Sequence, residues 1–235
     1  MAGSDFTFGG RRQYYTQHGD YEILDYLVAR ERGVISPDHY ASWGFEDSIL
    51  YSWARETITE LAQDDQPFNF SMLTVDQHTP FGYLCELCPD TYEEQYANVL
   101  ACSSKQLGDF IAWCQEQPFY ENTTIVVTGD HASMVVGFYG SGYEKYLGDT
   151  DRKVYNAFIN SAVEPVKEKN RLFTTLDIFP STLAALGVQI EGERLGLGTN
   201  LFSEKETLAE QYGYDVLFGE MLKKSAYYNE EIMFP

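Results

Sequence analysis

The sequence predicts an α/β domain with a mostly parallel sheet and helices on both faces of that sheet. Two observations indicate this fold class. Short segments of strand-like composition alternate along the chain with longer segments whose apolar residues recur at helical spacing. One of the expected strands, residues 123–128, is the nearly continuous β-branched run TTIVVT, which is typical of a strand buried on both faces of a parallel sheet.

The elements follow in chain order. The first 19 residues are rich in glycine and aromatic residues and show neither a helical nor a strand period, which predicts a loop. The helices that we expect from apolar periodicity cover residues 20–33, 47–62, 92–117 and 176–186. The strands that we expect from short aromatic or β-branched segments cover residues 67–75, 123–128 and 154–159.

Composition narrows the class of protein. The 235 residues contain no repeat or Pro/Ser-rich linker, so we expect one domain over residues 1–235. A hydrophobic content of 44% excludes intrinsic disorder. The sequence has no signal peptide and no apolar run of the roughly 20 residues that span a bilayer, so the chain as written is expected to be soluble. A net charge of −20 opposes binding to nucleic acid, which we do not expect as a partner.

Polar side chains follow two of the expected strands directly. Asp130 and His131 come after residues 123–128, and Asp76 and His78 come after residues 67–75. Ligands gather at the carboxyl ends of strands in such sheets. A carboxylate and an imidazole together suit Mn²⁺, Zn²⁺ or a related divalent ion, so we predict that Asp130 and His131 bind metal. The alternative is a turn in which the aspartate caps the next segment and the histidine packs nearby.

Arg11 and Arg12 stand in the glycine-rich aromatic segment FGGRR. A guanidinium group is well shaped to bind a phosphate or sulfate oxyanion. An exposed arginine pair in a loop is more often only solvated, so the residues alone leave both interpretations open.

The chain has four cysteines. Cys85 and Cys88 form a C-x-x-C motif, which could be redox-active or half of a zinc site. Cys102 and Cys114 are 12 residues apart with no histidine nearby, which disfavours a tetrahedral zinc site. Cys114 falls on the apolar side of its expected helix, and Cys102 could form a disulfide with Cys85 or Cys88 in an oxidising compartment. The sequence does not assign the pairing.

Four ordered segments together resemble a known family. They are LTVDQHTP (73–80), YANVLACS (96–103), NTTIVVTGDH (122–131) and LDIFPSTL (176–183). They are similar to the sulfatase-like branch of the alkaline phosphatase superfamily, and within it to phosphoglycerol transferases of the phosphoglycerol transferase I and lipoteichoic acid synthase type. Gly10, the segment WGFED (43–47) and the segment GLG (196–198) also resemble the first of these.

The resemblance implies an alkaline-phosphatase-like fold that lacks its first strand or strands, with residues 1–235 forming the C-terminal portion of a single sulfatase-like catalytic domain. The parent protein would be a metal-dependent bacterial enzyme at the extracytoplasmic face of the cell membrane. It would move phosphoglycerol from phosphatidylglycerol to a glycan or polyol phosphate acceptor, such as a teichoic acid. The metal-binding Glu and the metal-bound Thr nucleophile of the family would lie outside this chain, so we expect the chain alone to be inactive.

The resemblance also implies roles for single residues. Asp130 and His131 match the Asp-His metal pair, for one divalent cation that is most often manganese, with Mg²⁺ or Zn²⁺ as alternatives. His78 matches a substrate-side histidine that binds the phosphoglycerol group or moves a proton, and Arg11 would contact the phosphate. Thr79 departs from the pattern, because the family often has a second histidine there.

Two other functions stay open at this point. One is sulfate ester hydrolysis or phosphoethanolamine transfer within the same superfamily, although the C/S-x-P-x-R motif of sulfatases is absent from these residues. The other is a non-catalytic binding module, which applies if the native protein starts at Met1.

Overall fold

The computed structural model describes residues 1–64, 66–135, 138, 153–223, 225 and 230. The chain divides into two compact units, which are described here one at a time. Unit 1 comprises Met1–Tyr120 and Ala132–Lys153, and unit 2 comprises Glu121–His131 and Val154–Pro235. No helix in the described ranges combines the length and the apolar character needed to cross a bilayer.

Unit 1 begins with a buried extended segment. Ala2 forms a parallel bridge with Leu73, and Ser4 forms an antiparallel bridge with Gly44. Gly44 has a φ of 156°, and a Cβ atom there would lie 1.9 Å from the carbonyl oxygen of Gly3, so this close backbone approach requires glycine. The expected strand over residues 67–75 is thus reduced to one bridge at Leu73.

A helix follows where the sequence predicted a loop. A 3₁₀ turn over Phe8–Gly10 leads into α1 (Arg11–Gln17). The loop prediction for the first 19 residues was therefore wrong. Because α1 buries none of its residues, it lacks the apolar period by which the other helices are identified.

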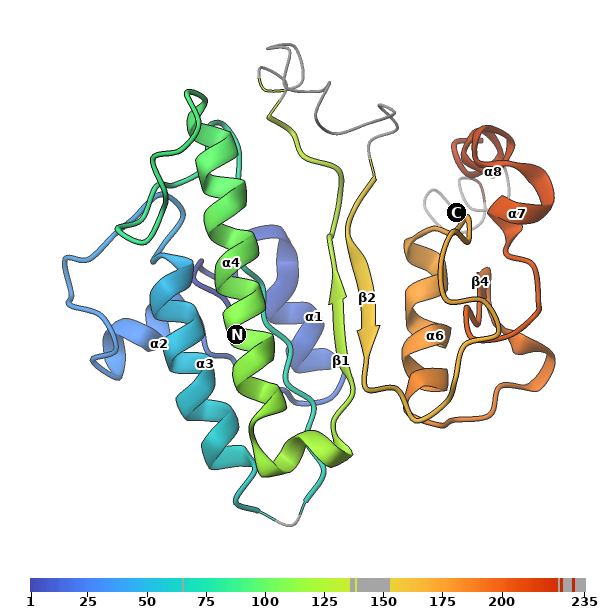
Figure 1. Cartoon of the computed structure of the whole chain (residues 1–235), viewed down its shortest axis with the longest axis horizontal. Helices are drawn as coiled ribbons and strands as arrows, with labels where there is room; N and C mark the ends of the chain where they lie inside the picture. The colour runs from blue at the N-terminus through green and yellow to red at the C-terminus, as the bar shows by residue number, and fades with distance from the viewer. Residues whose placement is uncertain (65, 136–137, 139–152, 224, 226–229, 231–235) are drawn as a thin grey trace. The chain divides into compact units, whose positions relative to one another are not determined.

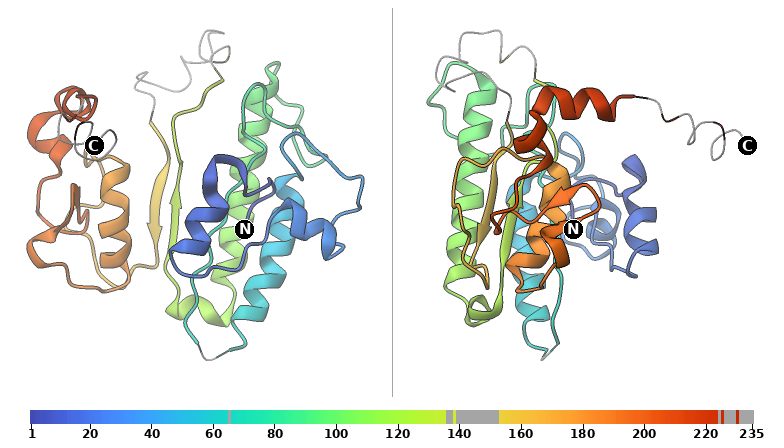
Figure 2. Two further views of the ribbon diagram at one scale, coloured as in Figure 1. Left: turned by 180° about the vertical axis from the view of Figure 1, so that it is seen from behind. Right: turned by 90° about the vertical axis from the view of Figure 1, so that its right-hand side faces the viewer.

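Two longer helices form the body of unit 1, preceded by the short α2 (Tyr26–Glu31). The helices α3 (Asp47–Leu61) and α4 (Gln95–Gln115) match the expected segments 47–62 and 92–117. They lie side by side in Figures 1 and 2, and the rings of Tyr51 and Phe110 pack 5.1 Å apart between them. The expected helix over residues 20–33 is shorter than predicted, because the Asp25 side chain caps it by accepting hydrogen bonds from the N–H groups of Leu27 and Val28.

Unit 2 contains the strand pair β1 (Ile125–Thr128) and β2 (Asn156–Ile159). The pair is antiparallel, with Ile125 opposite Ile159 and Thr128 opposite Asn156. The α/β class agrees with the sequence, which predicted a mostly parallel sheet and gave no direction for this one pair. The side chains of β1 are half-buried or exposed rather than buried on both faces. Its β-branched composition therefore did not indicate whether the strand is parallel or antiparallel to its neighbour.

The remainder of unit 2 packs around a short helix. A 3₁₀ turn (Thr175–Asp177) leads into α6 (Ile178–Ala185), close to the expected helix over residues 176–186. The strands β3 (Arg194–Leu195) and β4 (Gly198–Thr199) form a small hairpin, and the helices α7 (Leu208–Tyr212) and α8 (Tyr214–Met221) follow. The core consists of Ala184, Ala185, Ile190 and Phe202, with Phe158 of β2 packed against it.

Candidate functional site

Arg11 is the first residue of α1, and its guanidinium group is fixed by local hydrogen bonds. Nε donates to the carbonyl oxygen of Phe8 (3.2 Å), and Nη2 donates to Ser4 Oγ (3.3 Å) and to the carbonyl oxygen of Asp5 (3.5 Å). The guanidinium carbon lies 5.5 Å from the ring centroid of Phe8. These bonds use Nε and Nη2, so the two N–H groups of Nη1 can be offered to an oxyanion.

Arg12 has a structural role instead. Its Nη2 lies 2.5 Å from Oδ2 of Asp25, which is fully buried and caps α2. A buried carboxylate needs such a partner, so the cation of Arg12 is committed to the fold.

His78 packs against Trp43, with ring centroids 4.2 Å apart, and Trp43 packs in turn against Phe8 at 5.6 Å. The four side chains Arg11, Phe8, Trp43 and His78 thus form a continuous series, which we call the Arg11–His78 row. The two residues that the resemblance assigned to the substrate, Arg11 and His78, thus lie at the two ends of this row, with Phe8 and Trp43 between them. Sequence reasoning missed the part of Trp43, although the segment WGFED contributed to the resemblance.

The tautomer of His78 follows from its hydrogen bond. Nδ1 lies 3.0 Å from the carbonyl oxygen of Thr79. A carbonyl oxygen can only accept, so Nδ1 carries the proton. In the neutral ring Nε2 then has the lone pair, and it can accept a proton from a hydroxyl group.

An open pocket of about 400 Å³ borders the row. Phe8 and Trp43 belong to its lining, and so do Ser4 and Asp5, which Arg11 contacts. The other lining residues are Thr7, Tyr26, Leu27 and Tyr40. Aromatic rings beside a few polar groups suit a ligand that has both an apolar and a hydroxylated surface.

Asp76, which the sequence placed at a strand end beside His78, faces the interior of unit 1. Its Oδ2 accepts a hydrogen bond from the N–H of Asp47 (3.2 Å), and Asp47 accepts from the N–H groups of Val75 (2.8 Å) and Asp76 (3.1 Å). Both aspartates are buried. The pair joins the start of α3 to the loop that carries His78, so Asp76 supports that loop.

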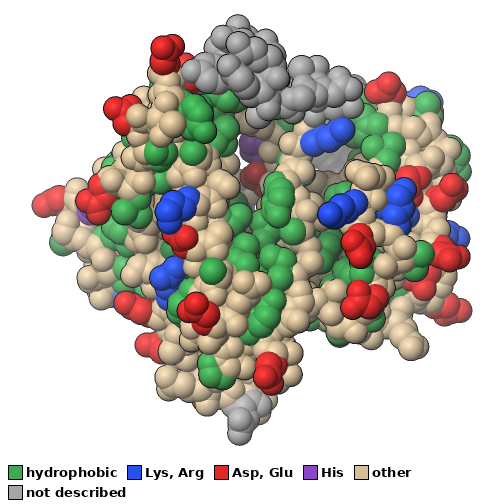
Figure 3. Space-filling model, viewed as in Figure 1, with side chains coloured by type: hydrophobic (Ala, Val, Ile, Leu, Met, Phe, Trp, Pro, Cys, Tyr) green, Lys and Arg blue, Asp and Glu red, His purple; other side chains and the backbone are tan. Residues whose placement is uncertain are grey.

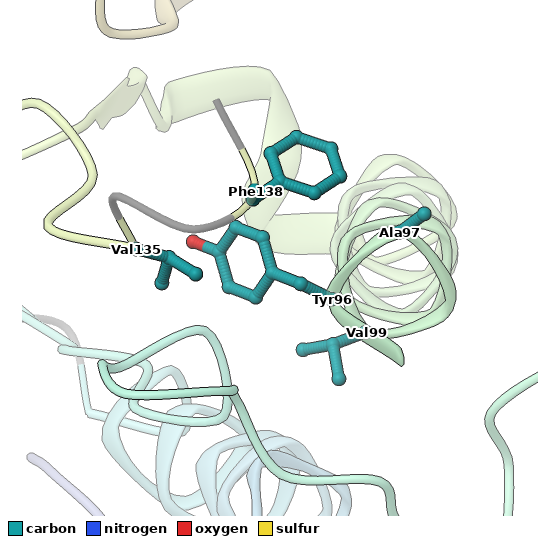
Figure 4. Close-up of a cluster of buried hydrophobic side chains, with 5 residues drawn as sticks. All are labelled: Tyr96, Ala97, Val99, Val135 and Phe138. Carbon is teal, nitrogen blue, oxygen red and sulfur yellow. The ribbon is translucent and has the colours of Figure 1, made fainter. Parts of the chain in front are cut away.

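Tyr96 of α4 holds the same loop from its other side. Its hydroxyl group donates to the carbonyl oxygen of Gln77 (3.2 Å) and lies 2.9 Å from Ser133 Oγ. Figure 4 shows the Tyr96 ring between Val135 and Phe138, with which it forms a buried cluster. Tyr96 thereby connects Gln77, in the loop that carries His78, to Ser133.

Asp130 and His131 follow β1 in unit 2, as the sequence predicted. Asp130 Oδ1 accepts a hydrogen bond from the backbone N–H of His131 (2.9 Å), and Asp130 Oδ2 lies 3.7 Å from His131 Nε2. Both side chains are more than half exposed, at 67% and 53%. The two donors are thus adjacent and exposed.

This donor pair fits a divalent cation. Metal–oxygen and metal–nitrogen bonds are each about 2.0–2.2 Å long for an ion such as Zn²⁺, so a single ion can contact donors that are up to about 4 Å apart. The separation of 3.7 Å between Asp130 Oδ2 and His131 Nε2 lies within that limit. The pair can supply two ligands of one metal site.

Comparisons with known proteins bear on the family. The chain is 27% identical over 183 residues to phosphoglycerol transferase I of Xanthomonas axonopodis pv. citri, covering 75% of this chain and 25% of that protein. It is 30% identical over 161 residues to phosphoglycerol transferase I of Escherichia fergusonii, covering 65% of this chain and 20% of that protein. The chain thus spans about a quarter of the length of the curated relatives that it matches.

Solved structures show the same fold. The lipoteichoic acid synthase LtaP from Listeria monocytogenes matches with a TM-score of 0.62 at 19% identity, over 85% of this chain and 50% of that one. A protein in the alkaline phosphatase superfamily from Vibrio parahaemolyticus matches with a TM-score of 0.61 at 21% identity, over 83% and 48%. A sulfatase family model matches residues 2–188, which include residues of both units. The chain therefore belongs to the sulfatase family, as the resemblance of its motifs indicated.

Proposed function

We propose that this chain is part of a phosphoglycerol transferase, which moves phosphoglycerol from phosphatidylglycerol to a glycan or teichoic acid acceptor. The observation that supports this most directly is the Arg11–His78 row beside an aromatic pocket. At one end of the row, the cation of Arg11 can bind a phosphodiester. At the other end, His78 can act as a base that accepts a proton from a hydroxyl group. The names of the curated relatives point to the same reaction class.

Each residue of the row has a distinct task in this proposal. Arg11 binds a phosphate oxygen through Nη1, while its bonds to Ser4, Asp5 and Phe8 hold the guanidinium group in place. Phe8 and Trp43 pack against the glycerol or glycan carbons and keep water away. His78 Nε2 takes the proton from the acceptor hydroxyl group as its oxygen forms the new bond to phosphorus.

The overall transfer is balanced. The bond between phosphorus and the diacylglycerol oxygen breaks, the phosphoglycerol group passes to the hydroxyl nucleophile, and the proton of that hydroxyl group goes to the diacylglycerol oxygen. The acceptor oxygen then replaces the nucleophile, and the acceptor proton passes through His78 to the released nucleophile oxygen, which restores both groups. We assign the nucleophile to a threonine in a part of the longer protein beyond these residues.

Asp130 and His131 bind the metal in this proposal, through a carboxylate oxygen and an imidazole nitrogen. A bound divalent cation, for which we propose Mn²⁺, would neutralise charge on the transferred phosphate and activate the nucleophile. We propose that the parent enzyme works at the extracytoplasmic face of the cell membrane.

The test uses the longer protein that contains this chain. We expect Asp130→Ala and His131→Ala each to lose both bound metal, measured by elemental analysis, and phosphatidylglycerol turnover. We expect His78→Ala to keep its metal and to lose transfer by about 100-fold or more. His18→Ala is the matched control, because His18 is exposed at the end of α1 and should leave both quantities unchanged.

Two outcomes would contradict the assignments. Metal and activity that persist in Asp130→Ala and His131→Ala would show that the proposed ligands are wrong. Loss of metal in His78→Ala would make His78 a ligand. Sulfate esters and phosphatidylethanolamine offered in the same assay distinguish the other reactions of the superfamily, because the proposal requires phosphatidylglycerol to be the preferred donor.

A further inference from the structure

Three cysteine side chains to which no role has been assigned above lie together in unit 1. Cys85 Sγ is 3.7 Å from Cys88 Sγ and 3.7 Å from Cys102 Sγ, and the three sulfur atoms all lie within 4.8 Å of one another. Cys85 and Cys102 are buried and Cys88 is half-buried, and all three are free thiols in this structure. We call this group the Cys85 cluster.

The sequence disfavoured a zinc site because Cys102 and Cys114 are 12 residues apart. Both lie on α4, where 12 residues correspond to about 18 Å along the helix axis. Cys114 is therefore too far away to join the group, whereas Cys102 alone faces the C-x-x-C segment. The six residues between Cys88 and the start of α4 return the chain so that Cys102 reaches Cys85 and Cys88, and cysteine spacing alone did not reveal this path.

The local structure presents the sulfur atoms toward one point. The N–H of Cys88 donates to the carbonyl oxygen of Cys85 (3.1 Å), which closes the C-x-x-C segment into a turn. One helical turn after Cys102, Gln106 Nε2 lies 3.3 Å from Cys102 Sγ and 3.8 Å from Cys85 Sγ. Three thiols and one buried side-chain amide thus share a single site.

The sulfur spacing matches a metal–thiolate site. With zinc–sulfur bonds of about 2.3 Å, two thiolates of a tetrahedral site lie about 3.8 Å apart, whereas a disulfide requires about 2.05 Å. The separations from Cys85 Sγ to Cys88 Sγ and to Cys102 Sγ are both 3.7 Å. Burial raises the pKa of the Cys85 and Cys88 thiols, so without a metal they stay protonated and neutral. Binding of a metal would replace these protons and release them to solvent.

We propose that Cys85, Cys88 and Cys102 form a binding site for Zn²⁺ that is separate from the metal pair Asp130 and His131. The fourth ligand is water or the side-chain amide of Gln106. Flipping that amide by about 180° would exchange Nε2 and Oε1 and turn the oxygen toward the metal. The site fastens the loop after His78 to α4, because two of its ligands lie in that loop and one lies on the helix. Its role is therefore structural support of the loop that carries His78.

The experiment uses residues 1–235 with Asp130→Ala and His131→Ala, so that metal bound at that pair does not interfere. The metal-free, reduced protein is titrated with Co²⁺ and then with Zn²⁺. We expect one equivalent of Co²⁺ to give thiolate charge-transfer absorption in the near ultraviolet and the visible bands of a tetrahedral site. Zn²⁺ should displace Co²⁺ and remove both signals.

Substitutions locate the signal. Cys88→Ser changes the least buried ligand and Cys102→Ser changes the helical one, and each should weaken Zn²⁺ binding by more than about 10-fold while the far-ultraviolet circular dichroism stays unchanged. Cys114→Ser is the matched control, because this buried cysteine lies on the same helix outside the cluster, and it should bind Zn²⁺ like the parent. A cobalt spectrum without thiolate bands would overturn the proposal. So would a disulfide within the cluster, shown by mass spectrometry, in protein isolated with its native metal content.

Discussion

At the scale of single residues, the buried carboxylates Asp47 and Asp76 affect stability most distinctively. Each accepts a hydrogen bond from the backbone N–H of the other, so the two negative charges lie close together. Burial, followed by the charges of Asp47 and Glu46, raises the pKa of Asp76 to about 7. Burial also raises the pKa of Asp47, against the effect of its hydrogen bonds from Val75 and Asp76.

These pKa shifts fix the sign of a pH effect. Between about pH 4 and pH 7 the folded state binds more protons at this pair than the unfolded state does, so the free energy of unfolding falls as pH rises. We expect Asp76→Asn to flatten this dependence by roughly 1 kcal/mol for each pH unit in that window. Urea unfolding at a series of pH values measures it.

The control for this prediction is Asp64→Asn, because Asp64 is exposed just after α3 and should keep the parental slope. A parental slope in Asp76→Asn would show that the pair does not titrate in this range.

Asp76 also shows what could not be predicted from the sequence. Aspartate after a strand looks like a ligand, and only the fold shows that Asp76 turns inward to cap α3 whereas Asp130 stays exposed.

At the scale of elements, Arg171 organises the C-terminal half of unit 2. Its Nη2 and Nε bind the two carboxylate oxygens of Glu210, at 2.7 and 3.2 Å. Its Nη1 donates to the carbonyl oxygens of Leu201 (3.0 Å) and Ser203 (2.9 Å). Glu210 also accepts from the N–H of Thr207 (2.9 Å), which completes the capping box that begins α7.

Loss of this arginine should therefore destabilise a whole region. Its side chain is only 8% exposed, so Arg171→Ala leaves Glu210 and several carbonyl groups without their partner. We expect a loss of about 3–5 kcal/mol in the free energy of unfolding, measured with urea. Lys223→Ala removes the exposed ion pair with Glu220 and should cost less than about 1 kcal/mol. Similar losses in the two variants would contradict this account.

The accuracy of element prediction follows burial. The helices α3 and α4 each bury one apolar side, and residue spacing located them to within a few residues. By contrast, α1 buries nothing and was missed, and residues 1–4 are extended and buried although their sequence carries no strand pattern. Those four residues depend on partners at Leu24, Gly44 and Leu73, which local sequence cannot reveal.

At the scale of the whole molecule, the order of four motifs identified the family where no single motif was specific enough. The family match over residues 2–188 confirms that inference. The order of the motifs did not predict which other residues surround the matched positions. Trp43 beside His78 and Cys102 beside Cys85 are contacts between distant segments, and they depend on how loops close rather than on any periodicity.

Net charge gives the last prediction. The chain carries a formal charge of −20, and acidic side chains are spread over the face shown in Figure 3. The proposed lipid donor is itself anionic, so residues 1–235 should be repelled by phosphatidylglycerol vesicles at low ionic strength. Added salt screens this repulsion, and any association measured by vesicle flotation should therefore rise with salt. Neutral phosphatidylcholine vesicles are the control, for which salt should make little difference. Binding at low salt that weakens as salt is added would instead require a basic membrane-facing surface.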